Sequence, residues 1–245
     1  MSATLRPKTL GLLGVGKGEY EFHEWARVFP GNRHPIYLCP ARTSRGKEIR
    51  IDRRTSDEDE LAWVEWIDRI IDGRLDRKGL IQTVSYLRQQ YLLEHSRHAG
   101  IMLGNTNEPD SESAVEIAEE FRAREAPAIL VSPSFTVGWD FPMRQCEYVI
   151  VCKVPFKPSQ GKVGKAREAR DPQYSAYLTM QDLIQGAGRA MRAENDRCEI
   201  FCCDSHLGWF MAKNKNLSPD WFAKAIRKVT EIPKAPLRLE DEKAR

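Results

Sequence analysis

The sequence lacks an apolar run long enough to cross a bilayer. A spanning helix needs about 20 apolar residues, whereas one of the longest apolar runs here covers only residues 148–152. The first residues also lack the apolar core of a signal peptide. We therefore expect no membrane segment and a cytoplasmic location.

Paired cysteines are missing as well. No two of the six cysteines form a CxxC pair, and several lie inside apolar runs. Zinc and iron–sulfur sites usually draw their ligands from paired cysteines on loops. We expect small buried thiols and propose no metal site. The cysteines are Cys39, Cys146, Cys152, Cys198, Cys202 and Cys203.

A large excess of one charge is also absent, since 38 basic residues face 35 acidic ones and the net charge is +3. This value does not identify a nucleic-acid partner. The distribution of charge is more informative, because residues 153–170 contain six basic side chains and one acidic one, Glu168. Gly, Pro and Ser in this stretch indicate a loop, which either follows a phosphate backbone or is simply solvated.

Short β-rich runs alternate with helical patterns along the middle of the chain. This alternation is typical of an α/β fold, a parallel sheet with helices on both faces. The apolar continuity of residues 129–131 and 148–151 favours strands that are buried on both sides. Strands are expected at 79–83, 100–103, 128–132, 147–152 and 198–203, and helices at 57–71, 85–94, 112–124 and 173–191.

The two ends show no such alternation. Residues 1–50 contain scattered aromatics and prolines, and we expect a short helix and irregular packing there. The α/β domain should cover 51–232 and close with a helix at 218–229, for which Ser218 is the expected N-cap. Residues 233–245 resemble a frayed charged tail or a linker.

In open parallel sheets, ligands bind outside the carboxyl ends of the strands. After the expected strand 128–132, Ser134 and Thr136 offer hydroxyls to phosphates, and Gly138 permits close backbone approach. Asp140 offers a carboxylate to a ribose hydroxyl or an arginine. The same residue types also form ordinary turns.

A second candidate site covers residues 185–192. On a continuous helix Gln185, Arg189 and Arg192 share one face, where two guanidiniums need an anion between them. A nucleoside triphosphate supplies that charge. Gly186 and Gly188 each weaken a helix by about 1 kcal/mol relative to Ala, which indicates a close partner. The alternative is a solvated basic face paired with acidic side chains.

The third candidate, residues 78–86, is a strand that runs into a helix. Thr83 and Ser85 would suit a phosphate of DNA or ATP, or Ser85 simply caps the helix. Residues 11–18 match the phosphate-loop spacing GxxxxGK, but Gly18 stands where a Ser or Thr should bind magnesium, and no buried strand precedes them. We therefore do not interpret 11–18 as a phosphate loop.

These stretches resemble motifs IV, V and VI of superfamily 2 helicases, in particular the DinG/XPD-like branch. Residues 185–192, QGAGRAMR, are similar to motif VI (QxxGRxxR), and residues 138–141, GWDF, to the GxDF of motif V. Residues 79–86 resemble motif IV, and the SAT of residues 2–4 resembles motif III, which precedes the second RecA-like domain.

The resemblance implies a RecA-like second domain of a P-loop NTPase helicase. ATP and Mg²⁺ would lie between this domain and an N-terminal RecA-like domain, which carries the phosphate loop and the acidic Walker B box. The roles implied are arginine fingers for Arg189 and Arg192, their positioning for Gln185, nucleotide binding for Gly138, Asp140 and Gly188, and contacts to single-stranded DNA for Thr83, Ser85, Ser134 and Thr136.

We therefore expect the C-terminal motor domain of an ATP-dependent DNA helicase, a branch that typically moves 5′ to 3′. Its partners would be single-stranded DNA and the N-terminal RecA-like domain, without which the chain should not hydrolyse ATP. The alternatives are a non-catalytic RecA-like module that binds nucleic acid or regulates, and an RNA helicase domain.

Overall fold

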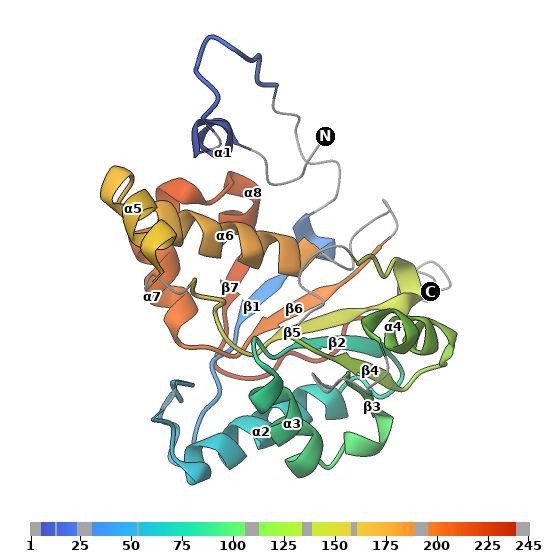
Figure 1. Cartoon of the computed structure of the whole chain (residues 1–245). Coiled ribbons are helices and arrows are strands. Elements are labelled where there is room, and N and C mark those ends of the chain that lie inside the picture. The colour runs from blue at the N-terminus through green and yellow to red at the C-terminus, as the bar shows by residue number, and fades with distance from the viewer. Residues whose placement is uncertain are drawn as a thin grey trace.

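The computed structural model describes residues 6–12, 14–23, 31–52, 54–105, 113–133, 139–157, 161–188 and 196–238. These residues form a seven-stranded, fully parallel sheet in the order β3-β4-β2-β5-β6-β1-β7 (Figure 1). The predicted fold class, a parallel sheet with helices on both faces, is confirmed. The strands are β1 Ile36–Leu38, β2 Lys78–Gln82, β3 Met102–Leu103, β4 Ala128–Val131, β5 Tyr148–Val151, β6 Glu199–Cys202 and β7 Ile226–Lys228.

The strands at the centre of the sheet are buried on both faces. Along β5, Val149 and Val151 pack into one apolar core, while Tyr148 and Ile150 pack into the other. This alternation follows from the two-residue period of a strand. It explains why β4 and β5 have uninterrupted apolar sequences.

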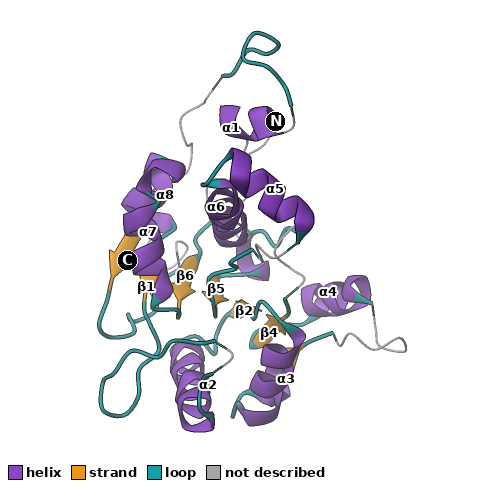
Figure 2. Ribbon diagram, turned by 60° about the vertical axis from the view of Figure 1, so that its left-hand side comes forward, coloured by secondary structure: helices purple, strands orange, loops and turns teal. Residues whose placement is uncertain are grey.

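Helices cover both faces of the sheet (Figures 1 and 2). On one face lie α2 Asp57–Asp72 and α3 Tyr86–His95, whose buried apolar residues belong to one core. The other core contains residues of α4 Ala114–Ala123, α6 Tyr174–Ala187, α7 His206–Lys213 and α8 Asp220–Ala225. Two further helices, α1 Pro7–Leu12 and α5 Lys162–Arg170, have no buried residues. Single 3-10 turns lie at Gly31–Arg33, Ala99–Ile101, Met143–Gln145 and Lys215–Leu217.

Side-chain caps fix the starts of several helices. Ser56 accepts a hydrogen bond from the Asp59 amide at 3.2 Å, so the acidic run 57–60 is the first turn of α2, as predicted. At α4, Ser113 and Glu116 form a reciprocal capping box. The hydrogen bonds from Ser113 lower the pKa of Glu116.

Three segments differ from the prediction. The first fifty residues contain β1, which lies between β6 and β7 in the sheet and not in irregular packing. The predicted helix 218–229 ends at Ala225, begins after Pro219 as N-cap and not after Ser218, and is followed by β7. The expected basic loop includes α5, because Lys, Arg, Ala and Glu favour helices and all the loop-forming residues except Gly164 lie before it.

The end of the chain is also more ordered than expected. Arg74 donates to the carbonyl of Pro233 at 3.0 Å, and Arg77 donates to that of Pro236. Arg238 forms a two-pronged ion pair with Glu147, at 2.8 Å for both bonds. Residues 233–238 therefore form a docked segment, not a frayed tail; the prediction was wrong for this part of the tail.

All six cysteines are buried and free, as predicted. Burial raises the pKa of the Cys152, Cys202 and Cys203 thiols, so they are poor nucleophiles. Among the described residues, no group of three or more His, Cys, Asp or Glu side chains is arranged to hold a metal ion. The helices of that same part of the chain include none that is long and apolar enough to cross a membrane.

Candidate nucleotide and nucleic-acid site

The end of α6 carries the first half of the 185–192 run. Gln185 lies in the last turn of α6, is partly exposed, and accepts a hydrogen bond from the amide of Gly188, the C-cap. The described part of α6 ends at Ala187, with Gly188 as its C-cap, whereas the sequence predicted a helix to residue 191. The shared face of Gln185, Arg189 and Arg192 stays a prediction. Arg189 and Arg192 lie outside the described residues.

Gly186 has the close partner that its sequence context predicted, but that partner belongs to the protein and is not a ligand. A Cβ added at Gly186 would lie 2.7 Å from Oε1 of Gln82, the last residue of β2. The Gln82 amide is 3% exposed and its Nε2 donates to the Gly186 carbonyl at 3.3 Å. Gly188 has no atom within 4 Å of such a Cβ. The close-partner argument therefore holds for Gly186 and stays a prediction for Gly188, where the described residues leave open space.

His34 holds the same helix end from a second side. Its Nε2 donates to the carbonyl of Ala187 at 2.8 Å, which satisfies one of the acceptors that a helix end leaves free. His34 is 1% exposed and stacks on Trp221 of α8, with ring centroids 6.3 Å apart. Gln82 and His34 together fix the position from which residues 189–192 continue.

The two glycines provide a matched pair of substitutions. Gly186→Ala is expected to lower the free energy of unfolding by about 1–3 kcal/mol, because the new methyl displaces the buried Gln82 amide. Gly188→Ala should change it by less than about 1 kcal/mol, because its φ of −79° and the open space suit alanine. Urea unfolding of both variants tests this difference. Equal costs at the two positions would contradict the packing role of Gln82.

The stretch that resembles motif V is described only in part. Ser134, Thr136 and Gly138 lie outside the described residues. Asp140 is exposed, and its carbonyl accepts a hydrogen bond from Arg122 of α4 at 3.2 Å. The Arg122 guanidinium lies 5.8 Å from the Trp139 ring and 5.4 Å from the Phe141 ring. These contacts anchor the backbone on both sides of Asp140 and leave its carboxylate at the surface.

Asp140 lies near the amino ends of the strands and not near the carboxyl ends, where it was expected. Arg122 precedes β4 by a short turn, and the amide of Met143 donates to Asp196, just before β6, at 2.8 Å. The connection from β4 therefore returns across the sheet before β5 begins. Asp140, the predicted nucleotide residue, lies toward the amino ends of the strands. The predicted DNA residues Thr83 and Ser85 lie at the carboxyl end of β2.

At the carboxyl end of β2, the turn 83–85 is partly strained. Thr83 is 1% exposed, and its hydroxyl donates to the Ser85 carbonyl at 3.2 Å. Val84 has a φ of 67°, a conformation that costs a branched residue about 1–3 kcal/mol. Ser85 is exposed and caps α3 by accepting from the Arg88 amide, so its capping role is confirmed. Of the two hydroxyls, only that of Ser85 faces solvent.

A buried polar network lies beside this turn. Gln89 of α3 donates to the Asn105 carbonyl, and Ser132, directly after β4, donates to the Asn105 side chain at 2.9 Å. The network joins the carboxyl ends of β3 and β4 to α3. It fixes the backbone at Ser132, from which the chain continues to the stretch that resembles motif V.

Sequence reasoning missed Gln82, His34, Arg122 and Asn105. The signal that could have found Gln82 is its place at the end of an apolar strand, because a polar residue buried there needs a partner. No local pattern identifies His34 or Arg122, since their partners lie 153 and 18 residues away.

Comparisons with known proteins agree with this architecture. The helicase C-terminal domain family matches residues 76–225. A comparison with curated protein sequences gives no match. Among solved structures, the chain is similar to Xpd4 of S. tokodaii, with a TM-score of 0.53 and 18% identity over 80% of this chain and 38% of that one.

Two more structures show the same fold. An apo XPD structure has a TM-score of 0.57 and 14% identity, covering 80% of this chain and 40% of the other. S. cerevisiae Dbp5, in a structure bound to RNA and ADP BeF3, has a TM-score of 0.56 and 11% identity over 94% of this chain and 50% of its own. The chain thus spans less than half the length of these XPD structures. Since the family match covers more than half of the sequence, the chain belongs to the helicase C-terminal domain family.

Proposed function

We propose that this chain is the C-terminal motor domain of an ATP-dependent DNA helicase. ATP and Mg²⁺ would bind between it and an N-terminal RecA-like domain that carries the phosphate loop and Walker B carboxylates. The observation that carries the proposal is the double anchoring of the α6 end by Gln82 and His34, directly before Arg189 and Arg192. A rigid support of this kind suits side chains that must meet a phosphate with fixed geometry.

The proposed roles follow from charge and position. Arg189 and Arg192 would reach the γ-phosphate across the domain cleft and stabilise the charge that develops on the transferring phosphoryl group. Gln185, one turn earlier, would orient them. Gly138, Asp140 and Gly188 would approach the nucleotide, where Asp140, which is exposed, would accept a hydrogen bond from a ribose hydroxyl or an arginine.

Thr83, Ser85, Ser134 and Thr136 would contact the phosphates of one DNA strand. Ser85 is exposed for this purpose, whereas Thr83 must release the Ser85 carbonyl before its hydroxyl reaches a phosphate. Gln82 adjoins Thr83 in sequence and contacts Gly186 in α6. A shift of the strained turn on strand binding would therefore reach the arginine-bearing segment through one side chain, which would couple the strand to ATP hydrolysis.

The test is ATP hydrolysis by the chain with and without an N-terminal RecA-like domain joined to it. We expect no turnover by the chain alone, and turnover stimulated by single-stranded DNA more than by RNA in the joined protein. Helicase-like turnover by the chain alone would refute the shared ATP site. Greater stimulation by RNA would favour an RNA helicase domain, and no turnover in either form would favour a non-catalytic module. A 5′-to-3′ direction is then measured by unwinding of tailed duplexes.

A further inference from the structure

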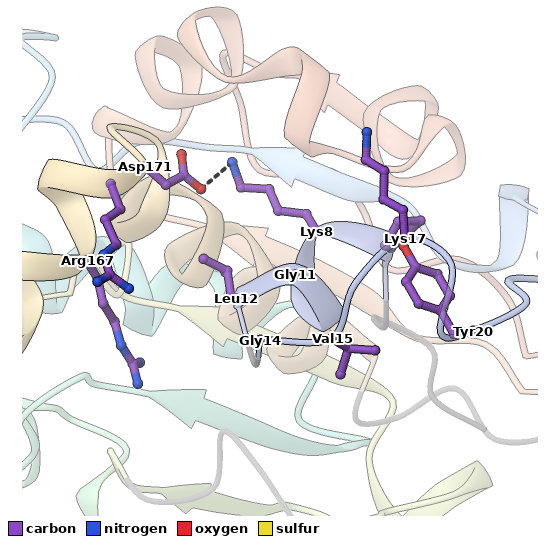
Figure 3. A pocket seen from close by; sticks show the side chains of 11 residues that line it. Lys8, Gly11, Leu12, Gly14, Val15, Lys17, Tyr20, Arg167 and Asp171 are labelled. Atoms are coloured by element: carbon purple, nitrogen blue, oxygen red, sulfur yellow. Dashed lines mark ion pairs between the residues drawn. The ribbon is translucent and has the colours of Figure 1, made fainter.

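A cavity of about 680 Å³ lies between α1, the loop that follows it, and α5 (Figure 3). Four of its lining side chains are cationic: Lys8, Lys17, Arg167 and Arg170. Asp171 is the one acidic side chain among its lining residues. The cavity wall therefore has a net charge of +3, taking four cations against one carboxylate.

Two of the four cations are held by internal partners. Lys8 forms an ion pair with Asp171 at 2.7 Å, visible in Figure 3, and this interaction holds the pKa of Asp171 below its usual value. Arg167 donates to the Tyr174 hydroxyl at 2.5 Å and lies over its ring. Lys17 and Arg170 are exposed, and within the described part of the chain neither has an acidic partner. These two cations are available to a ligand.

The sequence that matches the phosphate-loop spacing forms one wall of the cavity, with a different geometry. The helix α1 leads into this sequence and includes Gly11 and Leu12, where a phosphate loop would follow a strand. The Gly16 amide donates to Glu19 at 2.6 Å. Gly11 and Gly14 line the cavity, and no atom lies within 4 Å of a Cβ added at either one. A ligand would thus approach open backbone beside Lys17, without the amide cradle that holds ATP in a phosphate loop.

The opposite wall, α5, is an unusual helix. None of its residues is buried, and it carries four basic side chains against the single Glu168. A helix that is polar all round and lacks a buried face needs another source of stability. Here Arg167 and Glu168 bond to Tyr174 and Ser175 at the start of α6. The basic surface also extends beyond the cavity through Lys162 and Lys165.

We propose that this cavity binds backbone phosphates of a single nucleic-acid strand, at a site separate from the ATP site. The inference rests on the proposed function, which requires the chain to bind such a strand. A strand suits the surface better than a small phosphate compound, because the positive charge continues along α5. The separation follows from the position of the cavity residues Arg167, Arg170 and Asp171 before the start of α6, whereas Gln185–Gly188 lie at the far end of that helix.

The test uses the full 245-residue chain and a labelled thymidine oligonucleotide, with affinity measured over a range of salt concentrations. Removing Lys17 and Arg170 together by Lys17→Ala and Arg170→Ala should reduce the slope of log affinity against log salt by about 1.4, since each phosphate contact to a single strand contributes about 0.7. Arg45→Ala with Lys47→Ala removes the same two charges from an exposed loop between β1 and α2, and should leave the slope unchanged. Lys17→Arg with Arg170→Lys should retain it.

Circular dichroism checks that each variant is folded, which we expect because both side chains are exposed. An unchanged slope in the Lys17 and Arg170 variant would overturn this site and leave the proposed function untouched. An equal reduction of the slope in the Arg45 and Lys47 control would do the same. Inorganic tripolyphosphate that binds at the cavity and is not displaced by the oligonucleotide would also overturn the strand as occupant. If the unmodified chain fails to bind the oligonucleotide, the nucleic-acid part of the proposed function fails with the site.

Discussion

Replacement of Glu199 by alanine is expected to lower the free energy of unfolding by about 3–5 kcal/mol. Glu199 begins β6, and its carboxylate forms two hydrogen bonds of 2.8 Å with the guanidinium of Arg74. Both side chains are 0% exposed. Without the carboxylate, Arg74 would retain a positive charge in the protein interior, because the pKa of arginine lies too high for deprotonation.

Both members of this pair also contact other segments of the fold. Arg74 also donates to the carbonyls of Ile70 and Pro233, and its guanidinium lies 4.4 Å from the Phe201 ring. Arg77 approaches the same carboxylate at 3.8 Å. The pair therefore joins α2, β6 and the docked segment 233–238, and we expect this segment to loosen in the Glu199→Ala variant. Hydrogen exchange of the non-proline amides in 233–238 measures that effect.

A second Arg–Glu pair serves as the matched control. Arg42 and Glu48 lie 2.9 Å apart, nearly the same separation, but their side chains are 25% and 40% exposed. Glu48→Ala should cost less than about 1 kcal/mol, because solvent screens exposed pairs. Thermal unfolding should show a decrease on the order of 10 °C for Glu199→Ala and little change for Glu48→Ala. Equal decreases would mean that burial does not determine the contribution of the pair.

The sequence predicted the central strands of the sheet better than the strands at one side. The central strands β2, β4, β5 and β6 were predictable because their apolar runs reflect burial on both faces. The side of the sheet formed by β1 and β7 was not predicted: β1 lies between Pro35 and Pro40 and is too short to show a period. The edge strand β7, Ile-Arg-Lys, has a largely polar sequence. Its place in the sheet depends on pairing with β1, a contact between residues far apart in sequence.

For the candidate site, the sequence predicted some features but not the residues that contact them. Glycine at position 186 indicated a close partner, and one is present, but the sequence did not identify Gln82, which lies 104 residues earlier. The charged end of the chain seemed solvated because its sequence resembles a linker. Arg238 instead meets Glu147, and Arg74 and Arg77 bind its backbone carbonyls. Local patterns identify elements and motifs, whereas partners across the fold depend on the topology.

The second large effect concerns Arg189 and rests on the proposed function. In the chain joined to an N-terminal RecA-like domain, Arg189→Ala should lower kcat for ATP hydrolysis by about 10³–10⁵-fold, the range that arginine fingers contribute. Single-strand affinity should change little, because the guanidinium would act on the phosphoryl group and not on the strand. Arg189→Lys should restore only part of the rate, since an ammonium lacks the planar, forked geometry of a guanidinium.

Arg197→Ala is the matched control for this prediction. Arg197 lies eight residues after Arg189, and its guanidinium donates to the carbonyl of Leu237 at 2.5 Å. Its loss should cost about 1 kcal/mol of stability and leave kcat unchanged, since its role is to hold the docked segment. A kcat that falls equally in both variants would indicate a general loss of structure near β6. Normal turnover by Arg189→Ala would remove the finger role, and the anchoring of α6 by Gln82 and His34 would then serve stability alone.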